Sequence, residues 1–137
     1  RSVTLNIIQL LINVAPNSPR SVNCYGQMPL HTLCRNVGVE VLKLLIEECP
    51  EAVRHANRGG RLPIHIAARY LSPEFCRVLI EAYPGSERLG DADDKLPLHH
   101  ACRYSTLRTV EYLYKLYPDA INHEATYGHY PIHEVIH

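Results

Sequence analysis

The sequence predicts an all-α solenoid of stacked helix–turn–helix units joined by β-turn or hairpin loops. The prediction depends on three ladders of residues that share one register and one step of 34 positions. A Pro-(Leu/Ile)-His triplet forms the first ladder through Pro29, His31, Pro63, His65, Pro97, His99, Pro131 and His133. The other two ladders are Pro16, Pro50, Pro84 and Pro118, and Leu11, Leu45, Leu79 and Leu113. Self-similarity at a fixed period of this size is typical of a solenoid.

The ladders divide the chain into one array over residues 1–137. We expect a partial repeat at 1–22, complete repeats at 23–56, 57–90 and 91–124, and a partial repeat at 125–137. The apolar stretch 5–15 is in register with later helices, which favours a repeat helix over a signal peptide. We interpret the chain as an excerpt of a longer array, whose truncated ends leave apolar surface open to self-association.

Each element of one repeat can be justified from residues 57–90. Residues 57–61 have the composition of a tight turn in which Gly60 takes a positive φ, and Asp94 tolerates the same conformation in the next repeat. Pro63 suits the first position of a short helix, since that position needs no N–H donor. A second helix follows Ser72, expected to be its N-cap, and ends at Pro84.

Charge and cysteine content restrict the class of partner and the compartment. The 14 basic and 14 acidic side chains cancel, so no global field favours nucleic acid or a membrane, and local patches must select the partner. The five cysteines are odd in number and contain no CxxC pair, which favours reduced thiols and an intracellular setting, cytoplasmic or alternatively nuclear. Cys34 and Cys102 share a position with Ala68 and are expected to be small buried fillers.

The run Gly-x-x-Pro-(Leu/Ile)-His-x-(Ala/Cys), placed between a turn and a helix pair, resembles the ankyrin repeat. The usual threonine before the proline is replaced by Met28, Leu62, Leu96 or Tyr130, so apolar packing should replace its hydroxyl contact to the histidine. The period is also 34 where the family's is usually 33. Tetratricopeptide repeats share this period, but their Trp/Leu-Gly/Tyr pattern is missing and the chain has no tryptophan.

The resemblance implies a non-catalytic module, without cofactor or metal, that binds another protein or peptide in a concave groove. Carried over position by position, the groove candidates are Tyr25, Gln27, Arg35, Arg58, Arg61, Arg69, Tyr70, Asp93, Lys95, Arg103, Tyr104, Tyr127 and His129. Arginine and tyrosine are common at binding hot spots, and the locally basic face suits an acidic partner. No nucleic-acid or membrane partner is expected, and the full-length protein is expected to be monomeric.

Several alternatives stay open at the level of sequence. Arg35, Arg69 and Arg103 recur unchanged, so this ladder is either structural, bonding carbonyls at the helix end, or part of the binding surface. A second ladder, Arg20, Arg54 and Arg88, is interpreted as structural. The whole array is alternatively a spacer within a larger multidomain protein.

Two motifs suggest metal binding but have simpler interpretations. Residues 133–137 read HEVIH and match the zinc-hydrolase pattern HExxH. His133 already belongs to the histidine ladder, and Glu134 occupies a variable position shared with His100, so a zinc hydrolase is a remote alternative. The aspartates 91, 93 and 94 lack the rest of a calcium loop, and we expect them to form a solvated turn tip.

Overall fold

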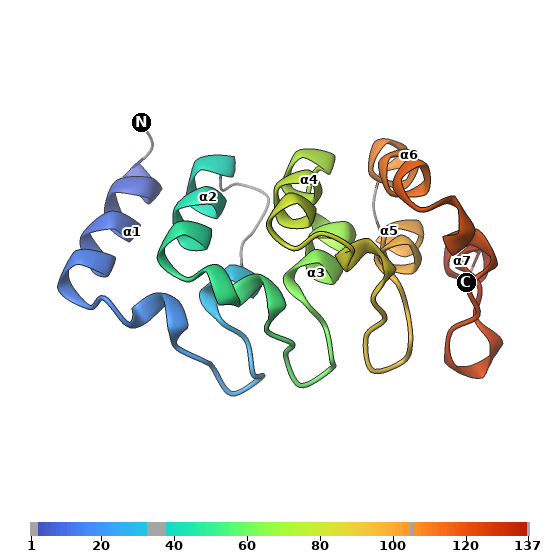
Figure 1. Ribbon diagram of the computed structural model, residues 1–137, viewed down its shortest axis with the longest axis horizontal. Helices are drawn as coiled ribbons and strands as arrows, with labels where there is room; N and C mark the ends of the chain where they lie inside the picture. The colour runs from blue at the N-terminus through green and yellow to red at the C-terminus, as the bar shows by residue number, and fades with distance from the viewer. Residues whose placement is uncertain (1–2, 33–37, 105, 137) are drawn as a thin grey trace.

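The computed structural model describes residues 3–32, 38–104 and 106–136, and it confirms an all-α repeat solenoid. Helices in the described residues follow the predicted order (Figure 1). The α-helices are α1 (Val3–Val14), α2 (Val39–Glu48), α3 (Pro63–Tyr70), α4 (Pro73–Ala82), α5 (Pro97–Tyr104), α6 (Leu107–Leu116) and α7 (Pro131–Val135). The 3₁₀ turns are η1 (Ser18–Arg20), η2 (Pro29–Thr32), η3 (Pro50–Arg54), η4 (Ser86–Arg88), η5 (Pro118–Asn122) and η6 (Thr126–Gly128).

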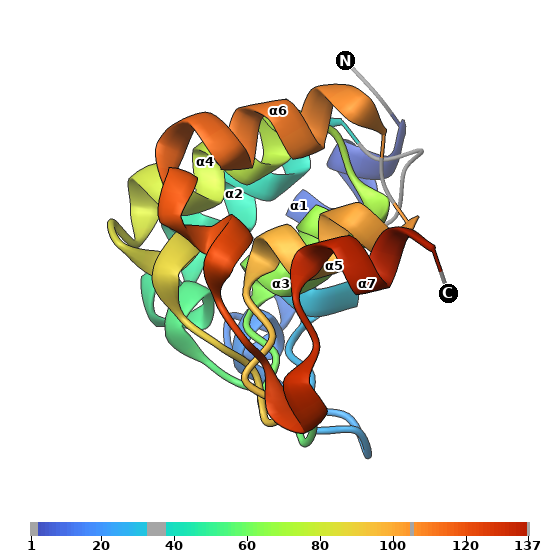
Figure 2. The ribbon, with the colours of Figure 1, turned by 90° about the vertical axis from the view of Figure 1, so that its right-hand side faces the viewer.

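The helices form two parallel rows. Helices α1, α2, α4 and α6 follow one another along one row, while α3, α5 and α7 lie side by side in the other (Figures 1 and 2). Helix α5 packs between α3 and α7, as expected of an array in which each unit contacts its neighbours. The loops between units project together along one edge of the array.

The proline triplets start the inner helices as predicted. Pro63 is the first residue of α3, and the extended backbone of Leu62 precedes it. Ile64, Ala67 and Ala68 are buried on the side of α3 that faces its neighbours. Ser72 occupies the predicted N-cap position of α4, although its side chain makes no capping hydrogen bond.

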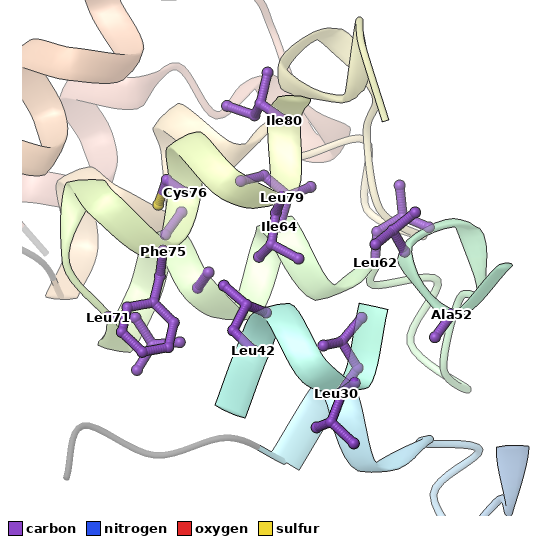
Figure 3. Close-up of a cluster of buried hydrophobic side chains, with 14 of the residues drawn as sticks. Leu30, Leu42, Ala52, Leu62, Ile64, Leu71, Phe75, Cys76, Leu79 and Ile80 are labelled. Carbon is purple, nitrogen blue, oxygen red and sulfur yellow. The ribbon is translucent and has the colours of Figure 1, made fainter. Parts of the chain in front are cut away.

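A continuous apolar layer runs between the two rows. Leu30, Leu42, Ile64 and Leu79 come from η2, α2, α3 and α4 and gather in one cluster (Figure 3). Leu42 is fully buried, and burying such a side chain contributes about 1.5–3 kcal/mol. Stability therefore comes from each unit's contacts with its neighbours along the array, in agreement with the solenoid prediction.

The cysteines behave as small side chains rather than as disulfide partners. Cys49 and Cys76 are buried in the apolar layer, Cys102 is half-buried and Cys24 is exposed, and all four are free thiols. Burial raises the pKa of Cys76 to about 12 and that of Cys102 to about 11, which suppresses thiolate reactivity. Cys34 lies outside the described residues.

The turns that open the complete repeats are each closed by one side-chain amide or carboxylate. Oδ1 of Asn57 accepts hydrogen bonds from the backbone N–H groups of Gly59 at 2.9 Å and Arg61 at 3.0 Å. Gly60 takes a φ of +71°, and Asp94 takes +58° at the matching position, as predicted. The turns also bond to one another, because the N–H of Ala92 donates to the carbonyl of Gly59 at 3.1 Å.

The ladder histidines connect the start of each inner helix to the chain segment that leads into or closes the next turn, as a structural role requires. Nδ1 of His65 accepts the N–H of Leu62 at 2.9 Å, so the neutral ring carries its hydrogen on Nε2 and donates it to the carbonyl of Leu89 at 2.8 Å. His31 and His99 repeat this arrangement, with Nε2 at 2.7 Å from the His55 carbonyl and 3.1 Å from the His129 carbonyl. All three rings are buried.

This burial predicts that acid destabilises the fold well before the carboxylates titrate. Burial and then the neighbouring His100 lower the pKa of His65 to about 4, and burial also lowers the pKa values of His31, His99 and His100. The unfolded chain therefore binds protons at a higher pH than the folded chain, so stability should fall between pH 6.5 and about 4.

Urea denaturation at about pH 7.5 and about pH 5.5 tests this expectation, since the carboxylates remain ionised at both values. The free energy of unfolding should be lower at the acidic value. An unchanged midpoint and slope across this interval would contradict the assignment of neutral, buried rings.

Candidate partner-binding groove

The predicted groove residues lie on the turns and at the C-terminal ends of the inner helices. At the turn tips, the side chains of Tyr25, Arg58, Asp93 and Tyr127 are exposed. Gln27, Arg61 and Lys95 are half-exposed at equivalent places in successive units, and His129 is exposed. Arg35 lies outside the described residues.

One hollow brings several of these residues together. It has a volume of about 280 Å³ and lies between the turn and inner helix of two adjoining units. Its described lining consists of Gln27, His31, Thr32, Asn57, Arg61, Ile66, Arg69 and Tyr70. The hollow thus combines polar turn residues with two arginines, a lining suited to a polar or charged side chain.

A cluster of arginine and tyrosine continues from the hollow along the ends of α3 and α5. The rings of Tyr70 and Tyr104 stack with centroids 6.1 Å apart, and the guanidinium of Arg69 lies 4.4 Å from the Tyr104 centroid. Arg103 lies 5.1 Å from the same centroid, and its Nε–H donates to the Tyr104 hydroxyl. The hydrogen bond from Arg103 lowers the pKa of the Tyr104 hydroxyl. These contacts hold the side chains in place on an otherwise exposed surface.

Asp91 does not belong to a solvated turn tip, so that expectation is wrong for this residue. Its side chain is 1% exposed, and Oδ2 lies 2.8 Å from Nε2 of His100 and 3.6 Å from Nε of Arg61. Burial opposes ionisation, but the hydrogen bonds from His100 and from the Lys95 and Asp93 N–H groups outweigh it and lower the pKa of Asp91. Asp93 is exposed, as is Asp94, as predicted for both.

Glu134, at a position that varies between repeats, is buried among the predicted groove residues Lys95, Arg103 and His129. Its side chain is 2% exposed, with Oε1 at 3.0 Å from Nζ of Lys95 and 3.4 Å from Nδ1 of His129, and Oε2 at 3.4 Å from Nη1 of Arg103. Burial would raise the pKa of Glu134, but these cations lower it to about 2. The basic face is therefore neutralised in part by the chain itself.

These contacts also weigh against the zinc-hydrolase alternative. The carboxylate of Glu134 is held by cations, and Nδ1 of His133 accepts the N–H of Tyr130 at 2.9 Å. His137, the second histidine of the motif, lies outside the described residues. Within the described ranges, no three histidine, cysteine or acidic side chains are grouped so as to hold a metal ion.

The two arginine ladders differ in what they contact. Arg54 and Arg88 place their guanidinium groups 4.3 Å and 4.5 Å from the ring centroids of Tyr83 and Tyr117 in the following unit. Arg20 instead pairs with Glu51 at 2.9 Å. This ladder joins adjoining units, in agreement with its structural interpretation. For Arg69 and Arg103, the described contacts are with tyrosine rings and Glu134, and the proposed bonds to helix-end carbonyls are absent from them.

Sequence reasoning missed the contacts that Asp91, His100 and Glu134 make with one another and with the groove candidates. A fourth ladder, which runs through Asn23, Asn57 and Asp91, was available as a signal, because each caps its own turn with Oδ1. The ladder ends at Ala125, which has no such side chain. There the turn closes with an isolated bridge between Ala125 and His129, and Tyr127 takes a φ of +65°.

A comparison with protein families decides the assignment. The family described as Ankyrin repeats (3 copies) matches residues 2–88. The chain belongs to the ankyrin-repeat family. Ankyrin repeats generally mediate protein–protein interactions and are generally non-catalytic. In this ankyrin array the same helix pairing continues beyond the matched residues, through α5, α6 and α7.

Two further findings concern the ankyrin array as a whole. No curated protein matches its sequence. Among the described residues, the array has no helix that is both long and apolar enough to cross a membrane.

Proposed function

We propose that this ankyrin array binds a partner protein or peptide through the groove formed by its turn tips and inner helices. The observation that carries the proposal is the arginine–tyrosine cluster around Tyr104. Tyr70 and Tyr104 are each more than 40% exposed although they stack on each other and on Arg69. Large aromatic and arginine side chains that are already ordered lose little conformational entropy when a partner covers them.

We further propose that the partner presents acidic side chains to the groove. Glu134 and Asp91 neutralise Lys95 and Arg61 in part. Arg58 and Arg69 have no carboxylate within ion-pair distance in the described part of the chain. Arg69 lines the hollow, and Arg58 is exposed at a turn tip. Charge complementarity of this kind steers association and selects partners.

The proposal also covers the repeat boundaries, the cellular compartment and the oligomeric state of the array. The repeat boundaries inferred from the sequence, 23–56, 57–90 and 91–124, agree in phase with the helix pairs and turns. Free thiols, including the exposed Cys24, are suited to a reducing intracellular compartment, cytoplasmic or nuclear. We propose a monomeric array, because the groove is formed by residues of a single chain and requires no second copy.

Affinity capture with two matched variants tests the groove. The groove variant carries Arg58→Ala, Arg69→Ala and Tyr104→Ala. The control variant carries Arg77→Ala, Arg108→Ala and Tyr114→Ala, which remove the same side-chain types from exposed positions on α4 and α6. We expect wild-type and control baits to retain the same partner, and the groove variant to lose at least about 90% of it, a loss of about 1.4 kcal/mol or more.

Thermal melting of all three proteins accompanies the capture. If the groove variant melts like the control and still retains the partner, the groove is not the binding surface. If no bait retains any specific protein, the spacer interpretation is favoured, because a spacer positions flanking domains without a ligand of its own.

A further inference from the structure

The chain itself demonstrates how this surface pairs cations with a carboxylate. Lys95 and Arg103 occupy equivalent positions to Arg61 and Arg69, one repeat later. Both contact the carboxylate of Glu134, which the next unit supplies at 3.0 Å and 3.4 Å. Two cations at these positions are therefore spaced so that one glutamate carboxylate can contact both.

The pair Arg61 and Arg69 has no such glutamate. His100 stands where Glu134 stands one repeat later, and it turns to Asp91 at 2.8 Å. Arg61 has one long ion-pair contact, in which its Nε atom lies 3.6 Å from Oδ2 of Asp91. No described carboxylate lies within ion-pair distance of Arg69. The guanidinium of Arg69 is instead 5.1 Å and 4.4 Å from the ring centroids of Tyr70 and Tyr104.

Both arginines are also poorly solvated at one nitrogen. The Nε atoms of Arg61 and Arg69 are buried and have no hydrogen-bond partner among the described residues. Leaving a buried donor of this kind unpaired is unfavourable, more so when the group is charged. Because each side chain as a whole is half-exposed, an external anion can reach the terminal guanidinium nitrogens, although not the buried Nε atoms.

The hollow of about 280 Å³ beside Ile66 provides the access. Arg61 and Arg69 line it together, and Gln27 and Asn57 add polar groups. No described acidic side chain lines it. Arginine binds a carboxylate through parallel N–H donors, so two arginines on one wall favour a carboxylate over a neutral side chain.

We infer that the hollow beside Ile66 binds a glutamate side chain of an acidic partner segment, whose carboxylate pairs with Arg61 and Arg69. The inference rests on the proposed function and specifies the chemistry of one subsite within it. A glutamate is chosen because the chain pairs its own Glu134 with the equivalent cations one repeat later. Glu134 approaches those cations from the following unit, whereas the hollow reaches Arg61 and Arg69 from the side of the preceding unit.

The test uses a hexaglutamate peptide as probe, with hexaglutamine as the uncharged control. Titration is followed through the Nε–H signals of the arginine side chains by nuclear magnetic resonance at low ionic strength. We expect hexaglutamate to shift the signals of Arg61 and Arg69, and hexaglutamine to leave them in place. Arg103, already paired with Glu134, is expected to respond weakly.

Two pairs of variants separate the hollow from general surface charge. Arg69→Gln should weaken hexaglutamate binding at least about tenfold, while Arg77→Gln, an equal loss of charge at an exposed position on α4, should change it less than about twofold. Ile66→Glu places a tethered carboxylate in the hollow, three residues before Arg69 on α3, and should also weaken binding about tenfold. Ile66→Gln is its neutral control.

The inference is wrong if Arg69→Gln and Arg77→Gln weaken binding equally, or if all exposed arginine signals shift together. It is also wrong if inorganic phosphate shifts the two signals and hexaglutamate does not. A natural partner retained by Arg69→Gln but lost by the groove variant would disprove the glutamate subsite while leaving the proposed function intact.

Discussion

Replacing His65 by alanine is expected to destabilise the array by about 3–5 kcal/mol, and to do so without any change in the groove surface. His65 is fully buried, and it satisfies the N–H of Leu62 and the carbonyl of Leu89 at once. Each buried group left unpaired costs about 1–3 kcal/mol. The cavity left by the ring adds to this cost, because packed neighbours relax only in part.

His133→Ala is the matched control, since His133 belongs to the same ladder. Its ring is exposed, and its Nδ1 accepts the backbone N–H of Tyr130 at 2.9 Å. We expect a cost below about 1 kcal/mol from this weaker site. Urea denaturation of both variants measures the difference, and equal shifts in midpoint would show that the ladder histidines do not stabilise the array through their buried hydrogen bonds.

The contrast between these histidines explains how much of the fold was predictable. The 34-residue ladders place the helix starts, because a proline at the first helical position and a histidine two residues later have one consistent local role. Hydrogen bonds within a turn join residues that are close in sequence. A repeated sequence motif therefore predicts the same hydrogen bonds in each turn. The sequence therefore predicted the turns, the inner helices and the structural role of His65.

The groove was less predictable, because its contacts join residues of different units. Glu134 and His100 occupy one repeat position, yet one neutralises Lys95 and Arg103 while the other turns to Asp91. Repeat position alone does not specify which neighbour a side chain contacts. A basic stripe inferred from composition thus overestimated the free positive charge of the surface.

The same distinction assigns different roles to two arginine ladders that look alike in sequence. Arg54 and Arg88 each cover a tyrosine ring of the next unit, so their repetition reflects a repeated contact. Arg69 and Arg103 both contact the ring of Tyr104, but of the two only Arg103 has a described carboxylate, that of Glu134, within ion-pair distance. An identical residue in each repeat therefore becomes a candidate for binding where its partner inside the chain is missing.

Gly60→Ala is expected to destabilise the array by about 2–5 kcal/mol, because two separate effects add at this turn. A positive φ of +71° costs an alanine about 1–2 kcal/mol in itself. The added Cβ would also lie 2.6 Å from the backbone nitrogen of Ala92, in the adjoining turn. That nitrogen donates to the carbonyl of Gly59, so relief of the clash must disturb the bond between turns.

Gly85→Ala separates strain from crowding, since its φ is +90° but a Cβ there would meet nothing within 4 Å. It should cost only the conformational part, about 1–2 kcal/mol. Crowding against a well-packed neighbour adds typically about 1–3 kcal/mol, and this is the excess expected for Gly60→Ala. Denaturation midpoints of the two variants provide the comparison. If Gly85→Ala were as damaging as Gly60→Ala, close stacking of successive turns would not be what requires glycine at position 60.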